Sequence, residues 1–485
     1  MSQGKLHSEI KNSSIPLLFL KSAYTEKNQF ISTESVIEWM KQRNEQVKVR
    51  IKKVAFQDLK SWFYDEGEGS LKHSTNKFFS VEGIRVRTNW GIINEWEQPI
   101  INQPEVGFLG FITKEIDGIL YFLMQAKIEP GNVNYVQLSP TLQATRSNFT
   151  QVHQGKKPLF LEHFQYATSK QIILDQLQSE QGARFLHKRN RNIIIKLEGD
   201  ISVPENFVWL TLAQIKKLMQ LDNVVNMDTR TVISGIPFGS FGSDVINFFT
   251  FIENNQKTDH LKIKFLTSAL ENQGSYHTIE EIITFITKLK SEFDLDIERI
   301  PLTKLKDWVF EEKTIHHKDN KYFKIIATEV EIGNREVMKW TQPMVEPSQE
   351  GLCAFICKEI NGILHFIVQA KLECGNHDII EFAPTVQCLT GNYRETKKGT
   401  LPFLEYVLNV KEDKIVFNAL QSEEGGRFFH EQNRNIIIID DDDEIAIELP
   451  PNYIWMTLNQ LYTFLKFNNY LNIQARSLIA AISFI

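Results

Sequence analysis

"GFLGFITKEIDGILYFLMQAK", residues 107–127, is the stretch of sequence that decides the fold. Two apolar runs flank Asp117 and Gly118, and apolar runs bounded by turn residues predict β-strands. Asp-Gly supplies the positive φ angles of a tight type I′ turn, so the stretch predicts an antiparallel hairpin. A second copy, "GLCAFICKEINGILHFIVQAK", occupies residues 351–371 and places Asn361 and Gly362 in the turn.

The likeness between the two copies extends far beyond the hairpins. "KKPLFLEHF" is matched by "TLPFLEYVL", "FLHKRNRNIII" by "FFHEQNRNIII", and "PENFVWLTLAQI" by "PPNYIWMTLNQL". The separation is nearly constant, at 244 residues between Gln125 and Gln369 and 243 residues between Gln178 and Gln421. A period this long does not suit a solenoid, so it indicates the tandem duplication of a whole domain. A length of 485 residues by itself favours two domains.

Composition places the boundary between the copies. "SGIPFGSFGSDV" is rich in Gly and Ser, which is typical of linkers. We therefore expect an N-terminal extension over residues 1–33, a first repeat over 34–234, a linker over 235–276 and a second repeat over 277–485.

Strand and helix signals are mixed within each repeat. Residues 33–47 and 278–293 predict amphipathic helices, and "RNIIIKL" and "RNIIIID" predict buried strands. "SEQGARFLHKRN" (179–190) and "SEEGGRFFHEQN" (422–433) predict a short helix with Ser at the N-cap. The expected fold class is α+β, or mixed α/β, with two tandem domains that each contain a mostly antiparallel sheet flanked by helices.

Composition excludes some classes of partner. A net charge of −6 argues against nucleic acid or an anionic membrane as the main partner. No stretch reaches the roughly 20 apolar residues of a membrane span, and the N-terminal apolar run is too short for a signal peptide. We expect a cytoplasmic protein.

The cysteines do not predict a metal site. Cys353 and Cys357 in "CAFIC" could form half of a zinc site, but no second cysteine pair or histidine cluster completes four ligands. Cys374 and Cys388 also lie among apolar residues, where a free cysteine packs as a small hydrophobic side chain. We expect neither a metal nor a disulfide.

The duplication shows which polar and aromatic residues are the same in both copies while the residues around them differ. A polar side chain gains little from burial unless it finds a partner, so persistence indicates a shared structural role or a shared ligand. The recurring pairs are Trp62/Trp308, His73/His317, Trp96/Trp340, Gln98/Gln342, Lys127/Lys371, Glu129/Glu373, Gln143/Gln387, Asn148/Asn392, Glu162/Glu405, Glu180/Glu423, Arg184/Arg427, Asn190/Asn433 and Arg191/Arg434.

Some of these pairs have a structural explanation. Glu180 and Glu423 would complement the dipole of the predicted helix, and Trp96 and Trp340 would be core anchors. The cations favour a ligand, because lysines at strand ends and arginines near a helix N-terminus form an anion site that suits phosphate or pyrophosphate.

Aromatic residues could complete a nucleotide site. Trp62 and Trp308, with Phe149 and Tyr393, offer a stacking surface for a base. The sequence contains no Walker loop, no dinucleotide fingerprint and no nucleophile elbow, so the nucleotide hypothesis rests on the recurring pairs alone.

Several long motifs resemble the NDP-hexose 2,3-dehydratases. They include "WEQPIINQPEVGFLGF" and "QSEQGARFLHKRNRN" in the first copy and "APTVQCLTGNY", "LQSEEGGRFFHEQNRN" and "NIQARSLIA" in the second. The resemblance runs from about residue 34 to residue 480. It implies a tandem pair of Nudix-like domains that have lost metal-dependent hydrolysis, and neither copy contains the glutamate-rich Nudix box that would hold magnesium.

The resemblance also implies a reaction. The implied substrate is dTDP-4-keto-6-deoxyglucose, a dTDP-hexose whose ketone acidifies the proton on C3, and loss of the C2 hydroxyl gives a 3,4-diketo-2,6-dideoxy sugar. No cofactor is expected, since the ketone is already present in the substrate. The implied partners are a second copy of the chain, in a homodimer, and an NADPH-dependent 3-ketoreductase that takes the product. The alternatives are a non-catalytic sugar-nucleotide binding protein and a metal-dependent pyrophosphohydrolase.

The family pattern carries over to named positions. The candidates for base and acid are Lys127, Glu129, His73, Lys371, Glu373 and His317. The implied first pocket contains Trp62, Thr145, Arg146, Ser147, Asn148, Phe149 and Ser179. The implied second pocket contains Trp308, Lys371, Pro384, Thr385, Val386, Gln387, Asn392, Glu424 and Gly425, and Arg184 and Arg427 are the phosphate candidates. We expect two bound dTDP per chain but one catalytic site, because binding needs both pockets whereas chemistry needs only one.

Overall fold

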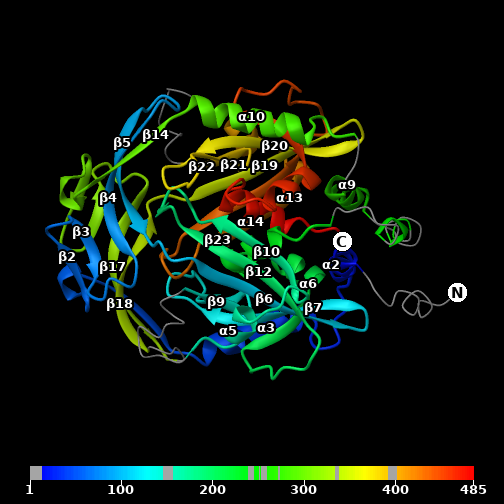
Figure 1. Ribbon diagram of the computed structural model, residues 1–485, viewed down its shortest axis with the longest axis horizontal. Helices are drawn as coiled ribbons and strands as arrows, with labels where there is room; N and C mark the ends of the chain where they lie inside the picture. Colours follow the sequence, from blue (N-terminus) through cyan, green and yellow to red (C-terminus); the bar gives the residue numbers. More distant parts are fainter. Residues whose placement is uncertain are drawn as a thin grey trace.

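The first repeat builds a large mixed sheet in the computed structural model, which describes residues 14–145, 157–238, 245–248, 250, 252, 259–270, 274–333, 338–390 and 401–485 (Figure 1). Its strand order is β10-β12-β6-β7-β13, with β9 beside β6 and β8 beside β7. The strands are β6 (Gly107–Ile116), β7 (Ile119–Ile128), β8 (Val136–Ser139), β9 (Leu142–Ala144), β10 (Ile172–Ser179), β12 (Arg189–Leu197) and β13 (Phe207–Thr211). Only β12 and β6 run parallel; the other pairs in this sheet are antiparallel.

The second repeat builds the same sheet again, in the order β21-β20-β19-β24-β23, with β22 beside β19 and β25 beside β20. These strands are β19 (Gly351–Ile360), β20 (Ile363–Leu372), β21 (Ile380–Ala383), β22 (Val386–Leu389), β23 (Ile415–Ser422), β24 (Gln432–Ile439) and β25 (Tyr453–Thr457). The predicted mixed, mostly antiparallel class is therefore confirmed for both repeats.

Both predicted hairpins are present at the predicted turns. Asp117 and Gly118 have φ angles of 51° and 79°, and Asn361 and Gly362 have φ angles of 54° and 77°. Two successive residues with positive φ are the requirement of a type I′ turn, which matches the twist of the paired strands.

Helices flank the sheets. The predicted amphipathic helices are confirmed as α3 (Thr33–Glu45) and α10 (Ile279–Glu292), and a capping box between Thr278 and Glu281 starts α10. The remaining α-helices with defined bounds are α2 (Ile15–Tyr24), α5 (Leu161–Gln165), α6 (Leu212–Leu218), α7 (Met227–Ser234), α9 (His260–Ala269), α12 (Leu404–Asn409), α13 (Leu458–Leu465) and α14 (Ile473–Ala481).

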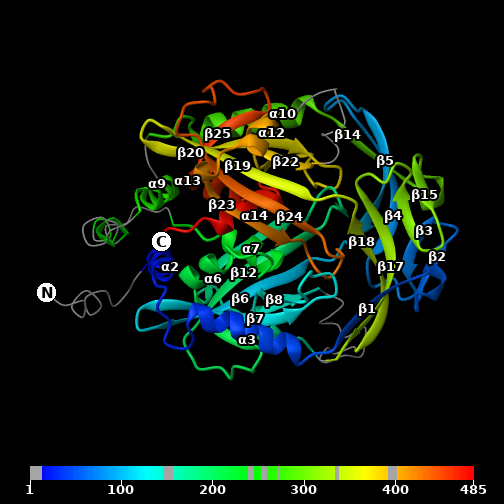
Figure 2. The same cartoon turned by 180° about the vertical axis from the view of Figure 1, so that it is seen from behind.

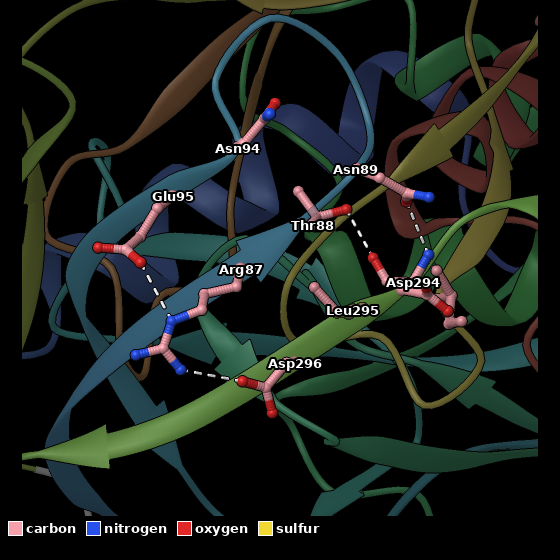
Figure 3. A pocket seen from close by; sticks show the side chains of 9 residues that line it. Arg87, Thr88, Asn89, Asn94, Glu95, Asp294, Leu295 and Asp296 are labelled. Atoms are coloured by element: carbon pink, nitrogen blue, oxygen red, sulfur yellow. Dashed lines mark hydrogen bonds and ion pairs between the residues drawn. The ribbon is translucent and has the colours of Figure 1, made fainter.

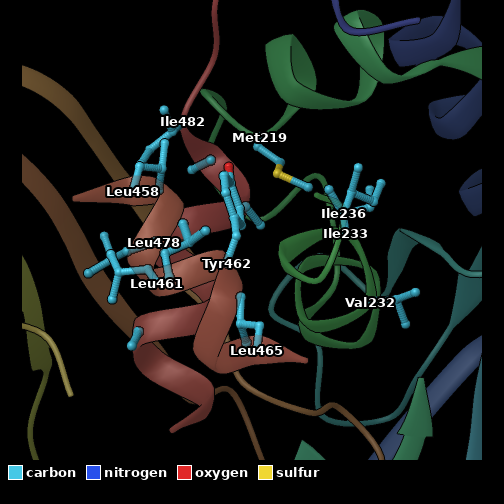
Figure 4. Close-up of a cluster of buried hydrophobic side chains, with 14 of the residues drawn as sticks. Met219, Val232, Ile233, Ile236, Leu458, Leu461, Tyr462, Leu465, Leu478 and Ile482 are labelled. Atoms are coloured by element: carbon cyan, nitrogen blue, oxygen red, sulfur yellow. The ribbon is translucent and has the colours of Figure 1, made fainter. Parts of the chain in front are cut away.

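The two large sheets enclose a shared helical layer. In Figure 1 the sheet of the second repeat lies above that of the first, with α14 between them. Figure 4 shows Tyr462 and Leu465 on α13 on the side that faces Ile233 and Val232 on α7. These residues belong to one buried cluster that draws side chains from both repeats, so burial of apolar surface joins the repeats.

Two smaller sheets lie at the opposite end of the molecule from the termini, and each contains one strand from the other repeat (Figure 2). One sheet holds β2 (Trp62–Asp65), β3 (Ser70–His73), β4 (Ser80–Thr88), β5 (Glu95–Asn102) and β11 (Phe185–Leu186) together with β14 (Leu295–Ile300) of the second repeat. The other holds β15 (Trp308–Phe310), β16 (Thr314–His317), β17 (Phe323–Ile332) and β18 (Lys339–Pro347) together with β1 (Val49–Val54) of the first repeat. The repeats thus exchange the strand that follows their first amphipathic helix.

The exchange is reinforced by paired tryptophans. Trp62 Nε1 donates to the carbonyl oxygen of Thr341 at 2.9 Å, and Trp308 Nε1 donates to the carbonyl oxygen of Glu97 at 2.7 Å. Trp62 lies in a buried cluster that also contains Phe79 and Phe323, one from each repeat. The two small sheets therefore share one core.

The predicted short helix at residues 179–190 and 422–433 is wrong. Ser179 and Ser422 end strands β10 and β23, and a single turn follows each of them. The segment is too short for a helix because Phe185 already pairs with Ile101 of β5. The anion site expected at a helix N-terminus therefore has no helix to provide it.

The four cysteines are free in the structure: Cys353, Cys357 and Cys374 are buried and Cys388 is half-buried. Among the described residues, no group of three or more His, Cys, Asp or Glu side chains could hold a metal ion. Within the same part of the chain, none of the helices has both the length and the apolar content needed to cross a membrane.

Candidate functional site

A turn of the second repeat meets the end of β7 in the first. Gly131 donates its backbone N–H to the carbonyl oxygen of Gly425 at 2.7 Å. Gly425 packs so closely that a Cβ atom there would overlap Asn132 Oδ1 and lie 2.8 Å from the Cβ atom of Glu129. Lys127 and Glu129 of one repeat therefore lie beside Glu424 and Gly425 of the other.

The same contact recurs with the repeats interchanged. Gly375 donates its backbone N–H to the carbonyl oxygen of Gly182 at 2.7 Å, and a Cβ atom on Gly182 would overlap Asn376 Oδ1. We refer to these two clusters of mostly buried residues as the first and second pockets. The first pocket consists of Lys127, Glu129, Asn132, Gln143, Asp228, Glu424, Gly425 and Arg427, and the second consists of Lys371, Glu373, Asn376, Gln387, Gln474, Gln181, Gly182 and Arg184.

A hydrogen-bond chain holds the acid of the first pocket. Asn226, the N-cap of α7, donates from Nδ2 to Gln143 Oε1 at 3.1 Å. Gln143 Nε2 donates to Glu129 Oε1 at 2.7 Å, and Lys127 Nζ lies 3.4 Å from the same oxygen. The chain orients the Glu129 carboxylate and pairs it with a cation.

The second pocket repeats the chain with one change. Asn472, the N-cap of α14, donates to Gln387 Oε1 at 2.7 Å, and Gln387 Nε2 donates to Glu373 Oε1 at 2.8 Å. Lys371 Nζ instead donates to the backbone carbonyl oxygen of Gln387 at 3.2 Å. Burial raises the pKa of Glu373.

Each phosphate candidate stacks on an aromatic ring of the other repeat. The guanidinium carbon of Arg427 lies 4.3 Å from the ring centre of Phe79, which packs against Trp62 at 4.8 Å. Arg184 lies 4.1 Å from the ring centre of Phe323, which packs against Trp308 at 5.0 Å. In each pocket the tryptophan and the arginine are therefore joined through a phenylalanine that contacts both.

Both pockets contain buried polar atoms without a hydrogen-bond partner. These atoms include Nε of Arg184 and Arg427, Oε2 of Glu373, Oε1 of Gln181 and the side-chain amide atoms of Asn376. Unsatisfied buried polar groups are rare in proteins, and a bound ligand or water is the usual explanation. Their concentration around the two exchanged turns marks both pockets as candidate ligand sites.

The pockets differ in their acidic residues. Glu424 and Asp228 of the first pocket correspond to Gln181 and Gln474 of the second in the repeat alignment. Burial, and after it the negative charge of Glu129, raises the pKa of Glu424 to about 7. Burial and the charges of Glu424 and Glu129 raise the pKa of Asp228 well above its ordinary range.

Two buried arginines connect the repeats behind the pockets. Arg230 donates to Gln421 Oε1 at 2.7 Å and to the carbonyl oxygen of Ser422 at 2.5 Å. Arg476 donates to the carbonyl oxygen of Ser179. These bonds hold the strand ends that carry the two turns, and they are absent from the sequence-based expectations.

The structure regroups the residues predicted for the two pockets. Glu424 and Gly425, expected beside Lys371, lie in the first pocket. Ser179 donates from Oγ to Glu381 Oε2 of the second repeat at 2.7 Å, in the buried bridge between the repeats. The grouping predicted from the sequence assumed that each repeat completes its own pocket, and the exchange overturns that assumption.

His73 and His317 accompany the tryptophans. Their rings pack edge-on against Trp62 at 5.4 Å and Trp308 at 5.7 Å, and His73 Nδ1 lies 2.9 Å from Thr75 Oγ1. Burial lowers the pKa of His317. The histidines therefore lie against the tryptophans of the two pockets.

The segment from Pro384 to Gln387 enters the second pocket through its last residue. Thr385 accepts the backbone N–H of Ile356 and donates to the carbonyl oxygen of Ile367, while Val386 is buried in the core. Arg146, Ser147, Asn148, Phe149 and Asn392 lie outside the described residues, and Thr145 is the last described residue before that gap.

A recess on the surface is a different kind of feature. It lies beside the β4–β5 turn, and Figure 3 shows Arg87 joined to Glu95 and Asp296 across its floor. Thr88 Oγ1 donates to the carbonyl oxygen of Asp294 at 2.6 Å. The polar groups of this recess secure the exchanged strand β14.

Sequence reasoning missed Asp228, Gln474 and the asparagine caps Asn226 and Asn472. The signal was present, because "LDNVVNMDTRTVI" (221–233) aligns with "FNNYLNIQARSLI" (467–479), and the asparagine recurs at the start of the final helix of each repeat. Asp228 is matched by Gln474, so a search for residues that recur in both copies passes over that position.

Comparison with known proteins identifies a family. The model of the NDP-hexose 2,3-dehydratase family matches residues 33–236 and again residues 279–482. The chain is 41% identical over 465 residues to a dTDP-4-dehydro-6-deoxy-alpha-D-glucopyranose 2,3-dehydratase of Saccharopolyspora spinosa, covering 96% of this chain and 94% of the relative.

Two further relatives carry the same name. The enzyme of Amycolatopsis orientalis is 38% identical, over 95% of this chain and 92% of its own length. That of Streptomyces violaceoruber is 37% identical, over 92% of this chain and 95% of its own length. The similarity therefore spans both repeats and the segment between them.

Proposed function

The chain belongs to the NDP-hexose 2,3-dehydratase family, and we propose that it is a hydro-lyase that removes water across C2 and C3 of dTDP-4-dehydro-6-deoxyglucose. The product is a 3,4-diketo-2,6-dideoxy sugar nucleotide, an intermediate of deoxysugar biosynthesis. The assignment rests on sequence identity to enzymes of this name. The identity is 37–41% and extends over more than nine-tenths of the chain.

The reaction is balanced without a redox partner. A base removes the proton on C3, and the electrons of that bond form an enolate with the C4 ketone. Return of those electrons expels the C2 hydroxyl, which leaves as water after an acid protonates it. The resulting enol gains a proton on C2 and loses one from its oxygen, which gives the 3-ketone.

The two pockets suit two nucleotides. Each offers an arginine stacked on an aromatic ring, a strand-end lysine and unsatisfied buried polar atoms. An arginine beside a lysine matches a diphosphate, and the adjacent tryptophan offers a face to the base or sugar. We propose two dTDP-binding pockets per chain, of which one performs chemistry.

The lysines have an electrostatic role in this proposal. A cation beside the C4 oxygen stabilises the negative charge that develops there as the C3 proton leaves. Lys127 and Lys371 each end an apolar strand next to a glutamate, which is where the reacting sugar ring would lie.

Further features follow from family membership as proposals. Each repeat derives from a Nudix-like domain, which agrees with a mixed sheet flanked by helices. The working form is a homodimer, and an NADPH-dependent 3-ketoreductase consumes the product. Sedimentation of the full chain checks the dimer.

Conversion of the proposed substrate tests the activity. The full chain is incubated with dTDP-4-dehydro-6-deoxyglucose and a chelator, and a 3-ketoreductase with NADPH traps the diketone as a 2,6-dideoxy-4-keto sugar. Binding without conversion would favour a non-catalytic sugar-nucleotide binding protein. Magnesium-dependent release of dTMP would favour a pyrophosphohydrolase.

A further inference from the structure

We propose that dehydration takes place in the first pocket, with Glu424 as the base that removes the C3 proton and Asp228 as the acid that protonates the departing C2 hydroxyl. This inference rests on the proposed dehydratase activity. It assigns the chemistry to a site completed by both repeats, because Asp228 comes from the first repeat and Glu424 from the second.

The first reason is geometric. The hydrogen bond from the backbone N–H of Gly131 to the carbonyl oxygen of Gly425 brings the Glu424 turn against the backbone that carries Glu129. Asp228 belongs to the first turn of α7, two residues after Asn226, which starts the hydrogen-bond chain to Glu129. Asp228 therefore lies within electrostatic range of Glu424, Glu129 and Lys127, and Glu424 lies within electrostatic range of Glu129.

The second reason is the internal comparison. The second pocket keeps the lysine, the glutamate, the glutamine, the asparagine cap and the arginine, but it has Gln181 and Gln474 where the first pocket has acids. Gln474 has a buried oxygen without a partner. Since the same framework accepts an amide at both positions, packing does not require the carboxyl groups of the first pocket.

The third reason is the proton affinity of the two acids. Burial raises the pKa of Glu424 to about 7, which leaves the group able to accept a proton at neutral pH. The pKa of Asp228 is raised well above its ordinary range, by burial and by the charges of Glu424, Glu129 and Glu180, with Lys127 opposing them. A raised pKa favours the protonated form of the carboxyl group, which is the form that can donate to a leaving hydroxyl.

The roles fit the electron flow of the reaction. Glu424 takes the C3 proton while Lys127 stabilises the enolate oxygen on C4. Asp228 then gives its proton to the C2 oxygen, the C2–O bond breaks and water leaves. Gln143 holds the Glu129 carboxylate, and this carboxylate in turn positions the ammonium group of Lys127.

Isotope exchange separates the two roles. In deuterated water Asp228→Asn should still exchange the C3 proton of the substrate, because the base remains, while conversion falls by about 10²–10⁴-fold. Glu424→Gln should lose both exchange and conversion. Both variants should still bind two dTDP per chain in calorimetry, which separates loss of chemistry from loss of the fold.

Two comparison variants complete the test. Glu381→Gln removes a buried carboxyl group of the bridge between the repeats, where the first repeat naturally has Gln137, and should leave conversion unchanged. Gln181→Ala, in the second pocket, should lower conversion less than tenfold, whereas Glu424→Ala lowers it more than a hundredfold.

Three results would overturn the inference while leaving the dehydratase activity intact. The first is that Glu424→Gln converts the substrate at the wild-type rate. The second is that Asp228→Asn no longer exchanges the C3 proton. The third is that Gln181→Ala lowers the rate of conversion more than Glu424→Ala does. A wild-type chain that does not convert the substrate would instead remove the proposed function itself.

Discussion

Gly131 of the first repeat and Gly425 of the second are joined by a backbone hydrogen bond of 2.7 Å, with no side chain between them. The relationship recurs between Gly375 and Gly182. Added Cβ atoms would overlap the carbonyl oxygen of Phe428 at Gly131 and that of Phe185 at Gly375. The pockets depend on this approach because it places the turn of one repeat against the strand end of the other.

Gly131→Ala should therefore destabilise the protein by at least about 3 kcal/mol, since the new methyl group meets backbone that cannot move aside easily. Urea denaturation followed by circular dichroism measures the change. Gly199→Ala is the matched control, because nothing lies within 4 Å of a Cβ atom at that position, and it should change stability by less than about 0.5 kcal/mol. Equal stability of the two variants would contradict the close contact.

Arg427→Ala and Arg184→Ala should each weaken dTDP binding at one pocket by about 1.5–3 kcal/mol, the usual contribution of a charge-assisted hydrogen bond. Because Arg427 belongs to the first pocket, its removal should also lower turnover far more than removal of Arg184. Calorimetric titration of dTDP and steady-state turnover measure the two effects.

A third recurring arginine provides the control for these variants. Arg191 pairs with Asp175 at 2.6 Å and lies in neither pocket, so Arg191→Ala should leave both binding events intact. A stoichiometry of one dTDP per chain, or matched partial losses of turnover from the two pocket variants, would overturn the two-pocket proposal.

Glu381→Gln should stabilise the protein at neutral and alkaline pH. Burial raises the folded-state pKa of Glu381 to about 7, from an ordinary value of 4.5, although Ser179, Arg476 and Lys290 oppose the shift and Glu373 adds to it. The folded state thus binds this proton more tightly than the unfolded state. The contribution of Glu381 to the free energy of unfolding is therefore fully present below about pH 4.5 and is lost as the pH rises through about 7.

The gain for this variant should be on the order of 2–3 kcal/mol at pH 8 and should vanish near pH 4.5. Denaturation midpoints of both proteins across this pH range provide the measurement. A gain that is independent of pH would show that the amide acts through packing and that proton binding is irrelevant.

Trp62→Phe should cost about 1–3 kcal/mol of stability, because it leaves the carbonyl oxygen of Thr341 without its donor across the exchange. Trp39→Phe is the control, since its Nε1 hydrogen bond to the carbonyl oxygen of Glu205 lies at an exposed surface. Full stability of Trp62→Phe would show that this hydrogen bond does not hold the exchanged strands together.

Local signals in the sequence were sufficient for the hairpins and the opening helices. Asp117-Gly118 and Asn361-Gly362 determine their own turn through backbone φ, and Thr278 with Glu281 starts α10 within one turn of chain. The helix predicted at Ser179 failed because strand pairing of Phe185 overrode a local capping pattern.

The sequence by itself determined the duplication, the two hairpins, the opening helix and the buried RNIII strand of each repeat, the family and the recurring lysines, glutamates and arginines. Those features depend on periodicity and on chain neighbours, which a sequence displays directly. Only the tertiary structure decided which repeat completes which pocket. β4 and β17 are equivalent strands of the two repeats, so β1 could form its backbone hydrogen bonds with either of them. The packing of the whole repeats against each other decides that β1 pairs with β17. That choice brings Glu424 to Asp228 and leaves the corresponding amides in the other pocket.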